Sequence, residues 1–442
     1  MKHFTEARNE AIRKIQEERS ILSRIKRICL IWDIKGLLRL LFEASESENY
    51  QEIKAKLSTI LRDAAGPFWS GEVWVWSKDS TPAEKAVYEA AWSNAIQEQA
   101  YAGSPEIRIL DRHYSKASWF TPPLDNPWPL NEKTPPILSF YSFKGGVGRT
   151  TALASLAIQL ARNGKKVAII DLDLEAPGLS TIFPGVEGRS AAHGVVDYLL
   201  ERPLIPQGKI DLEDFYHLID DSAIVGDGPP ITVIPAGNLD TSYLEKLARM
   251  DYEAIYQKQG GTTPPLQELL NHIKSQRKID YILLDSRAGL HDLGGLALSG
   301  ISHLDVLFGL NNEQSWRGME LVINFLGRNR IIRNQKQSPC ALVFTLAPEP
   351  GSKREETFQR FLERSYQLFS DHYYDEENAD PDEAWPLPGI QDSDHPHYPI
   401  TIGFNPLIQR YDQVKDIAHY LIDGDFKEFA RLILERIGRT LS

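Results

Sequence analysis

A glycine-rich turn near the middle of the chain constrains the fold more than any other feature of the sequence. The apolar run Ile137–Ser142 leads into Lys144–Thr151, which reads KGGVGRTT, and the helically spaced stretch Thr151–Ala161 follows at once. Glycines let the backbone turn with its N–H groups facing inward, and the start of a helix adds partial positive charge. A strand, a glycine turn and a helix in this order predict a cradle for a polyphosphate. A threonine directly after the cationic residue, Thr150, can offer its hydroxyl to Mg2+.

Beyond residue 136, short apolar runs alternate with helical stretches along the chain. This alternation predicts an α/β fold with a mainly parallel sheet and helices on both faces. In such sheets a ligand binds at the carboxyl ends of the strands. The expected strands are Ile137–Ser142, Val167–Asp171, Ile231–Ile234, Tyr281–Asp285, Val306–Leu310 and Ala341–Thr345, and the expected helices include Thr151–Ala161, Leu266–Ile273 and Met319–Leu326.

The segment KGGVGRTT resembles the deviant Walker A motif, KGG-x-GKT, of the ParA/MinD family of P-loop ATPases. Two further stretches stand in the order that this family uses. Ile170–Asp173, IDLD, resembles its first switch, and Asp280–Gly289, DYILLDSRAG, resembles its Walker B strand and second switch. Val233–Gly237, VIPAG, also recurs in such proteins between those elements. The resemblance covers about residues 137–440 and implies a SIMIBI-type P-loop fold that binds ATP and Mg2+.

The resemblance also implies a role for each matching residue at the nucleotide. Lys144 would reach across an ATP-sandwiched dimer to the phosphates of the partner subunit, and Asp173 would orient the attacking water. Gly289 would sense the γ-phosphate and Thr151 would meet the α-phosphate. Pro406 lies where the family often places backbone that contacts the base. Backbone donors to the phosphates would come from Gly145, Gly146, Val147, Gly148, Arg149, Thr150 and Thr151.

A magnesium site and one departure from the family pattern complete the implied site. Thr150 would bind the ion, Asp171 would lie near it, and Asp285 would hold it through water. Arg149 stands where the family has its cradle lysine. A guanidinium stays charged and can contact phosphate through two donors, but it is wider and planar, so the exchange is not conservative at a tight site. We expect nucleotide binding to persist and leave the rate of hydrolysis open. The candidate catalytic residues are Lys144, Asp173 and Arg149.

We expect the first 120 residues to form a mostly helical α+β domain. Apolar residues in Ile12–Trp32 recur at helical spacing, and a second helix carrying Ile53–Leu61 should end at Gly66-Pro67. Glu72–Trp76 and Ile107–Leu110 are candidate strands. Seven of the nine tryptophans lie before residue 129. They either build the core of this domain or form an exposed aromatic surface for a partner.

Three further stretches bear on the organisation of the chain. Residues 121–136, TPPLDNPWPLNEKTPP, are rich in proline, so we expect an extended linker between a domain at 1–120 and a domain at 137–442. Residues 371–399 are acidic and proline-containing, which predicts a surface insertion. The last helix, near Asp425–Leu441, has one apolar face. It either covers its own sheet or touches a membrane, as in MinD-like proteins.

Composition and charge narrow the class of protein. Hydrophobic residues make up 42% and charged residues 25%, which excludes a disordered, fibrous or multi-span membrane chain. Lys and Arg total 49 against 61 Asp and Glu, and the net charge of -12 disfavours general nucleic-acid binding. The chain has two cysteines and no apolar export segment, so we expect a cytoplasmic protein.

These observations favour a Mg2+-dependent ATPase that acts as a nucleotide-controlled dimerisation switch. It would form a homodimer on ATP binding and regulate an unidentified protein partner through the N-terminal domain. KGGVGR together with DSRAG resembles a bacterial subgroup with varied partner domains, some of which are linked to conflict or anti-phage systems. Two alternatives stay open. One is a non-hydrolysing nucleotide-sensing scaffold, with Arg149 as the sign of lost turnover, and the other is a ParA-like protein that positions DNA or another cargo.

Overall fold

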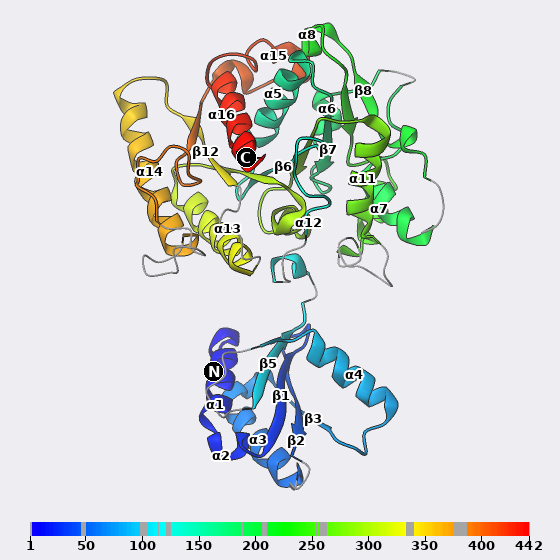
Figure 1. Ribbon diagram of the computed structural model, residues 1–442, viewed down its shortest axis with the longest axis vertical. Coiled ribbons are helices and arrows are strands. Elements are labelled where there is room, and N and C mark those ends of the chain that lie inside the picture. The colour runs from blue at the N-terminus through cyan, green and yellow to red at the C-terminus, as the bar shows by residue number, and fades with distance from the viewer. Residues whose placement is uncertain are drawn as a thin grey trace. The chain divides into compact units, whose positions relative to one another are not determined.

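The chain divides into two compact units, Met1–Ala117 and Ser118–Ser442 (Figure 1). The structure is a computed structural model of the 442-residue chain. It describes residues 2–45, 50–97, 105–113, 115–120, 125–186, 189–205, 210–252, 255, 263–332, 340–374 and 387–441.

The first unit is built on a five-stranded sheet with the order β3-β2-β1-β5-β4. The pair β1–β2 is antiparallel, whereas β1–β5 and β2–β3 are parallel. Side chains of α1 and α3 pack on one face of the sheet, and side chains of α4 pack on the other. The elements are α1 (Phe4–Glu17), α2 (Arg19–Leu22), β1 (Ile25–Trp32), β2 (Leu38–Ala44), α3 (Tyr50–Ala65), a 3-10 turn (Gly66–Phe68), β3 (Trp69–Trp76), α4 (Pro82–Ser93), β4 (Ile96–Gln97) and β5 (Glu106–Asp111).

One helix expected in this unit is partly a strand. Helical spacing through Ile12–Trp32 predicted a helix, but helix ends at Leu22 and Ile25–Trp32 is the central strand β1. Five consecutive residues of β1 are buried because helices cover both faces of the sheet. A strand buried on both faces loses the alternation that distinguishes it from a helix. The expected helix ending at Gly66-Pro67 and the two expected strands are confirmed.

Most of the tryptophans in the first 128 residues contribute to a core. Trp32 and Trp92 are buried in the first unit. Trp119 and Trp128 are also buried, but they belong to the second unit. The remaining three, Trp69, Trp74 and Trp76, are half-buried. The core interpretation for the N-terminal domain therefore holds for Trp32 and Trp92. Trp69 packs at the margin of the core on one face of the sheet, and Trp74 and Trp76 pack at the margin of the core on the other face.

The second unit is built on an eight-stranded sheet with the order β13-β12-β11-β6-β10-β7-β9-β8. The strand pairs are parallel except β8–β9, which confirms the expected mainly parallel α/β sheet. The strands are β6 (Ile137–Ser142), β7 (Val167–Leu172), β8 (His217–Ile219), β9 (Ile231–Ile234), β10 (Tyr281–Ser286), β11 (Leu304–Gly309), β12 (Cys340–Ala347) and β13 (Ile400–Gly403).

Helices cover both faces of this sheet (Figure 1). Val306 and Phe308 of β11 point into the core formed with α5 and α16, whereas Leu307 points into the core formed with α13 and α14. The helices are α5 (Arg149–Arg162), α6 (Leu179–Ile182), α7 (Val195–Glu201), α8 (Ser222–Val225), α9 (Tyr243–Ala248), α11 (Pro265–Arg277), α12 (Asp292–Leu296), α13 (Glu313–Ile332), α14 (Ser352–His372), α15 (Val414–Ile417) and α16 (Gly424–Leu441).

The last helix, α16, covers its own sheet. Phe426, Phe429, Ile433 and Ile437 are buried in the same core as α5. This apolar face is therefore already occupied, in agreement with the first of the two interpretations of its pattern. Across the part of the chain that the structure describes, no helix combines the length and apolar character needed to cross a membrane.

The two polar stretches are only partly described. Residues 125–136 of the expected linker belong to the second unit, where Trp128 Nε1 donates to Pro135 O at 2.9 Å. The expected domain boundaries stay a prediction. Residues 375–386 of the expected insertion lie outside the described residues. On its far side His397 is fully buried and lies 2.8 Å, Nδ1 to oxygen, from the Tyr374 hydroxyl, so this flank is packed into the unit.

Candidate phosphate-binding site

The glycine turn joins β6 to α5 at the centre of the second sheet. Gly146 and Gly148 adopt φ values of +72° and +81°, which only glycine adopts readily. Gly145 has no positive φ, and a Cβ there would meet nothing within 4 Å. The turn is exposed at all three glycines, whereas Val147 is buried and anchors it to the core. The result is an open loop at the N-terminus of a 14-residue helix.

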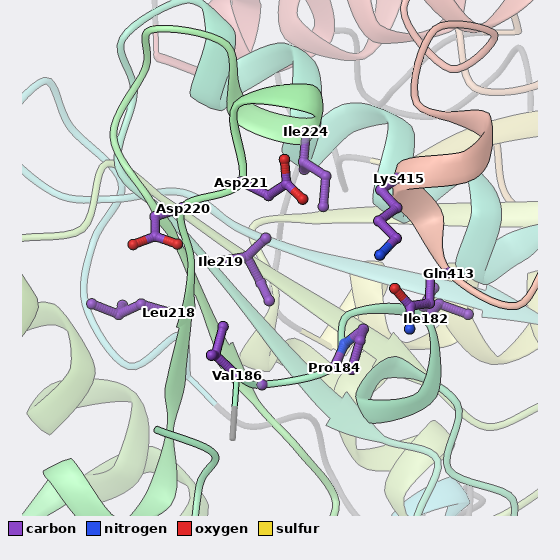
Figure 2. A pocket seen from close by; sticks show the side chains of 11 residues that line it. Ile182, Pro184, Val186, Leu218, Ile219, Asp220, Asp221, Ile224, Gln413 and Lys415 are labelled. Atoms are coloured by element: carbon purple, nitrogen blue, oxygen red, sulfur yellow. The ribbon is translucent and has the colours of Figure 1, made fainter. Parts of the chain in front are cut away.

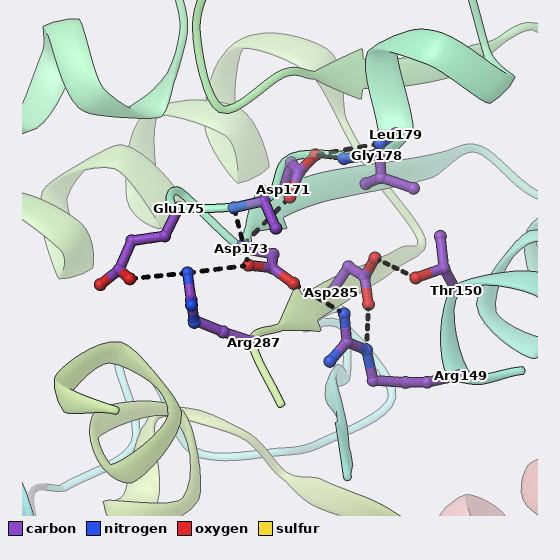
Figure 3. Close-up of polar contacts among 10 residues, drawn as sticks. Arg149, Thr150, Asp171, Asp173, Glu175, Gly178, Leu179, Asp285 and Arg287 are labelled. Atoms are coloured by element: carbon purple, nitrogen blue, oxygen red, sulfur yellow. Dashed lines mark hydrogen bonds and ion pairs between the residues drawn. The ribbon is translucent and has the colours of Figure 1, made fainter. Parts of the chain in front are cut away.

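The two cations of this loop differ in their surroundings. Lys144 is half-buried and makes no hydrogen bond or ion pair with any residue that the structure describes. Arg149 is 8% exposed and turns toward buried carboxylates. Its Nε donates to Asp285 Oδ1 at 2.7 Å and its Nη2 donates to Asp173 Oδ2 at 3.2 Å (Figure 3). In this structure the guanidinium therefore points into the protein.

Strand register brings two carboxylates side by side. Asp171 and Asp285 are directly opposite each other in the parallel pair β7–β10. Asp171 is fully buried and accepts hydrogen bonds from the N–H groups of Asp173, Gly178 and Leu179 at 3.0, 3.1 and 3.0 Å. Burial, followed by the charge of Asp285, raises the pKa of Asp171 to about 8. Burial also raises the pKa of Asp285, and the Arg149 cation opposes that increase.

The oxygen atoms around Thr150 suit a magnesium ion. Thr150 Oγ1 donates to Asp285 Oδ2 at 2.7 Å (Figure 3). Mg2+ prefers oxygen ligands and is commonly bound through one or two carboxylates together with substrate phosphates. In the described ranges, no group of three or more His, Cys, Asp or Glu side chains could hold a metal ion. An ion at this site would therefore depend on the Thr150 hydroxyl and on phosphate oxygens.

The two expected switches are linked by an arginine. Arg287 Nη1 lies 2.8 Å from Glu175 Oε2 and 3.8 Å from Asp173 Oδ1 (Figure 3). His291 Nδ1 lies 3.7 Å from Glu175 Oε1. Glu175 follows the first switch, Arg287 belongs to the second and His291 follows the second, so this ion-pair group joins both at the carboxyl edge of the sheet.

Gly289 lies where the second switch meets the phosphate-loop strand. Its φ is +84°, its N–H donates to Ser142 O at 3.0 Å, and its carbonyl accepts from the Tyr141 hydroxyl at 3.0 Å. A Cβ at Gly289 would meet no atom nearer than 3.7 Å, so the backbone conformation, rather than crowding, favours glycine here.

Pro406 opens an exposed 3-10 turn, Pro406–Ile408, that follows β13. The same segment reaches the phosphate loop through Tyr411, whose hydroxyl lies 3.1 Å from Thr151 Oγ1. Burial raises the pKa of Tyr411, so this hydroxyl is a neutral hydrogen-bonding group. The contact places the Pro406 segment beside the start of α5.

A separate cavity of about 210 Å³ lies beside α6, α8 and α15 (Figure 2). Ile182, Ile219 and Ile224 supply aliphatic walls, and Lys415 points into it. It shares no lining residue with the glycine loop or with the two switch segments, and we assign no ligand to it.

The structure brings most of the expected site residues together and adds several others. Arg149, Thr150, Asp171, Asp173 and Asp285 form one connected group. Sequence reasoning missed three residues that contact the phosphate loop or the second switch. An acidic residue close behind the first switch could have suggested the partner of Arg287, whereas no sequence signal pointed to the other two. The missed residues are Glu175, Tyr141 and Tyr411.

Known proteins match the second unit. Residues 138–433 match the CobQ/CobB/MinD/ParA nucleotide binding domain. An uncharacterized ATP-binding protein of Methanocaldococcus jannaschii is 32% identical over 178 residues, 40% of this chain and 53% of that protein. The septum site-determining protein MinD of Synechocystis sp. is 31% identical over 154 residues, 35% of this chain and 46% of that protein. The matched stretches thus span about half the length of these curated relatives.

Two solved structures match this chain at low identity and low TM-score. The cell division ATPase MinD of Pyrococcus furiosus is 20% identical with a TM-score of 0.40, and the match covers 69% of this chain and 98% of that one. The pNOB8 ParA bound to nonspecific DNA is 17% identical with a TM-score of 0.43, and the match covers 69% and 99%. Because the family match spans more than half of the chain, this protein belongs to the CobQ/CobB/MinD/ParA family of P-loop nucleotide-binding proteins.

Proposed function

We propose that this chain binds Mg-ATP, hydrolyses it slowly and uses it as a dimerisation switch to control a partner protein. The observation that carries the proposal is Lys144. This lysine stands at the start of an exposed glycine loop and has no partner among the described residues, although three carboxylates lie at the far end of the same loop. An unpaired cation at a phosphate cradle is suited to a phosphate bound across a subunit interface.

The loop supplies what a triphosphate requires. Exposed N–H groups at the start of α5 favour anions, and the open space at Gly145 allows close approach of a phosphate. Thr150 and Asp285 would hold the magnesium ion, which would neutralise charge on the phosphate oxygens. Pro406, next to the Tyr411 contact with Thr151, is the candidate for contact with the base.

Slow hydrolysis follows from the contacts of Arg149. Its guanidinium is bound by Asp285 and by Asp173, the residue proposed to orient the attacking water. Arg149 must exchange these carboxylates for phosphate oxygens before its guanidinium can neutralise charge on the transferring phosphoryl group. A buried charge pair separates at a cost of several kcal/mol, on the order of 3–5. A partner that favours the exchanged state would stimulate turnover.

The first unit is the candidate for partner recognition. It has a core of its own, and Trp69, Trp74 and Trp76 remain half-buried on β3. Tryptophan is favoured at the centres of protein interfaces. Both cysteines are buried and free, which suits the cytoplasm. The KGGVGR and DSRAG motifs support a bacterial role in conflict or anti-phage defence.

A second candidate function is a nucleotide sensor that does not hydrolyse ATP. The observation that favours it is the same ion-paired Arg149. Steady phosphate release that disappears in Asp173→Ala excludes the sensor, and nucleotide binding without phosphate release supports it.

The mass of Asp173→Ala in solution tests the proposed switch. We expect the mass measured by light scattering to double in Mg-ATP and to stay monomeric in Mg-ADP, because the trapped ATP state persists. Adding Lys144→Ala should abolish the doubling, whereas adding Lys165→Ala, at an exposed lysine of the same unit, should not. Equal masses in Mg-ATP and Mg-ADP would contradict the switch.

A further inference from the structure

The second unit begins with two buried side chains that hold the second switch. Ser118 is 1% exposed and Trp119 is 8% exposed. Ser118 Oγ donates to Asp292 O at 2.8 Å, and Trp119 Nε1 donates to His291 O at 2.9 Å. These successive carbonyls stand at the start of α12, just beyond Leu290, which follows Gly289. The first residues to follow the N-terminal unit in the chain are therefore bound to the segment that continues directly from the second switch.

The sequence of α12 is fitted to this contact. Gly295 has no positive φ, so backbone conformation does not require glycine there. A Cβ at Gly295 would lie 2.6 Å from Ser118 Oγ and 2.6 Å from Trp119 Nε1. Contacts this short are sterically forbidden, so the close approach of these two side chains requires glycine.

Trp119 also reaches Gly289 by a second route. Its ring lies 6.2 Å from the Tyr141 ring, centroid to centroid, and the Tyr141 hydroxyl donates to Gly289 O at 3.0 Å. On its other side the Trp119 ring lies 4.9 Å from the Phe325 ring, and Arg328 Nη2 donates to Trp119 O at 2.7 Å. Helix α13 thus holds the tryptophan in place while the tryptophan holds the switch.

We propose that Ser118 and Trp119 are positioning residues for the second switch, and that they transmit the nucleotide state to the N-terminal unit. The inference rests on the proposed function, because Mg-ATP is the ligand that moves the switch. A shift of Gly289 toward a γ-phosphate displaces the carbonyls of His291 and Asp292. Because both carbonyls are bound by the segment that continues directly from the first unit, that segment moves with the switch or releases it.

A purely structural role makes a different prediction. If Ser118 and Trp119 only completed the core, weakening them would reduce stability without changing the discrimination between ATP and ADP. If they position Gly289, weakening them changes the ratio of the affinity for ATP to the affinity for ADP. If ATP binding changes the docking equilibrium of this segment by a certain factor, thermodynamic linkage requires that docking of the segment change the affinity for ATP by the same factor.

The test uses the full chain with Trp119→Phe, which keeps an aromatic ring but removes the Nε1 donor, and with the milder Ser118→Ala. Trp128→Phe is the matched control, because Trp128 is 5% exposed and its Nε1 donates to the carbonyl of Pro135, away from the switch. Without nucleotide, we expect hydrogen exchange over residues 288–296 to rise about fivefold in both test variants and to stay at the wild-type rate in the control.

Affinities for Mg-ATP and Mg-ADP provide the second measurement. The ratio of the two should change about fivefold or more in Trp119→Phe and stay at the wild-type value in Trp128→Phe. In the wild type, Mg-ATP but not Mg-ADP should alter exchange in β5, and Trp119→Phe should remove that response. Wild-type exchange and ratio in both test variants would overturn the inference and leave the proposed switch intact. A wild-type protein that does not bind Mg-ATP would overturn both.

Discussion

Each end of the glycine loop carries one positively charged side chain, but only the one at the inner end is ion-paired. At the outer end, Lys144 has no partner among the described residues, and the glycines around it are exposed. At the inner end, Arg149 is 8% exposed and bound by Asp285 and Asp173. Thr150 is likewise bound to Asp285.

This difference separates two requirements of a switch. The outer end is stable without ligand because water can solvate the lysine. The amine therefore stays available to a phosphate that comes from outside the chain. The inner end satisfies its charges within the protein, because a buried arginine or carboxylate without a partner is costly. Ligand binding must therefore replace contacts at the inner end, whereas at the outer end it only adds them.

The largest expected effect comes from removing the inner cation. Arg149→Ala should lower the free energy of unfolding by about 3–5 kcal/mol without nucleotide, because it leaves Asp285 buried beside Asp171 without a cation. Urea unfolding measures the loss. Arg149→Lys retains the charge and should cost less. A loss below 1 kcal/mol in Arg149→Ala would show that the carboxylates are neutralised in another way.

The cost of Arg149→Ala should also depend on pH. Arg149 opposes the burial that raises the pKa of Asp285, so the variant raises that pKa further. A carboxyl whose folded pKa exceeds its unfolded value stabilises the fold only while protonated, and this stability is lost as pH rises. The free energy of unfolding of Arg149→Ala should therefore differ less from that of the wild type at about pH 5 than at about pH 8. A pH-independent difference in urea unfolding would contradict this charge argument.

An intermediate effect is expected at Thr150. Thr150→Val removes the hydroxyl that donates to Asp285 Oδ2 and should cost about 1 kcal/mol of stability. It should also weaken the magnesium dependence of ATP binding, measured by titrating the ion at fixed nucleotide. Thr151→Val is the matched control, because it makes the same exchange at a hydroxyl that contacts the neutral Tyr411. Equal loss of magnesium dependence in both variants would argue against the assigned metal ligand.

The smallest effect on stability is expected at the outer end. Lys144→Ala should change the free energy of unfolding by less than about 0.5 kcal/mol, because the amine makes no hydrogen bond or ion pair with any described residue. The same variant should lose ATP-dependent dimerisation entirely in light scattering. Substantial destabilisation would show that the lysine is needed within one chain, and the contrast between the two ends of the loop would fail.

The sequence predicted the second unit well, and in the first unit it failed at the central strand, for a physical reason. Strands such as Val167–Asp171 and Tyr281–Asp285 are short, apolar and separated by helices, so local pattern and tertiary setting agree. In the first unit, Ile25–Trp32 has helical spacing because helices on both faces of the sheet bury consecutive residues. The continuous apolar run does not distinguish a strand from a helix.

The candidate site shows the same limit. Lys144, Asp171, Asp173, Asp285 and Gly289 were predicted because they stand in motifs whose order along the chain is informative. The links between the motifs were not predictable. Nothing near Tyr411 or Trp119 in the sequence indicates that one contacts the phosphate loop and the other the second switch.

The amino-acid sequence by itself determined the α/β architecture of the second unit, the phosphate loop and the residues around it, because these depend on local backbone geometry and on the order of strands. The tertiary structure alone decided which charges are paired. Arg149 is neutralised because β7 and β10 are neighbours, which brings Asp173, just after β7, and Asp285 of β10 to the same guanidinium. The hold of Ser118 and Trp119 on α12 was decided in the same way, because it joins residues more than 170 positions apart. Such contacts arise from packing between distant segments, and no local pattern encodes them.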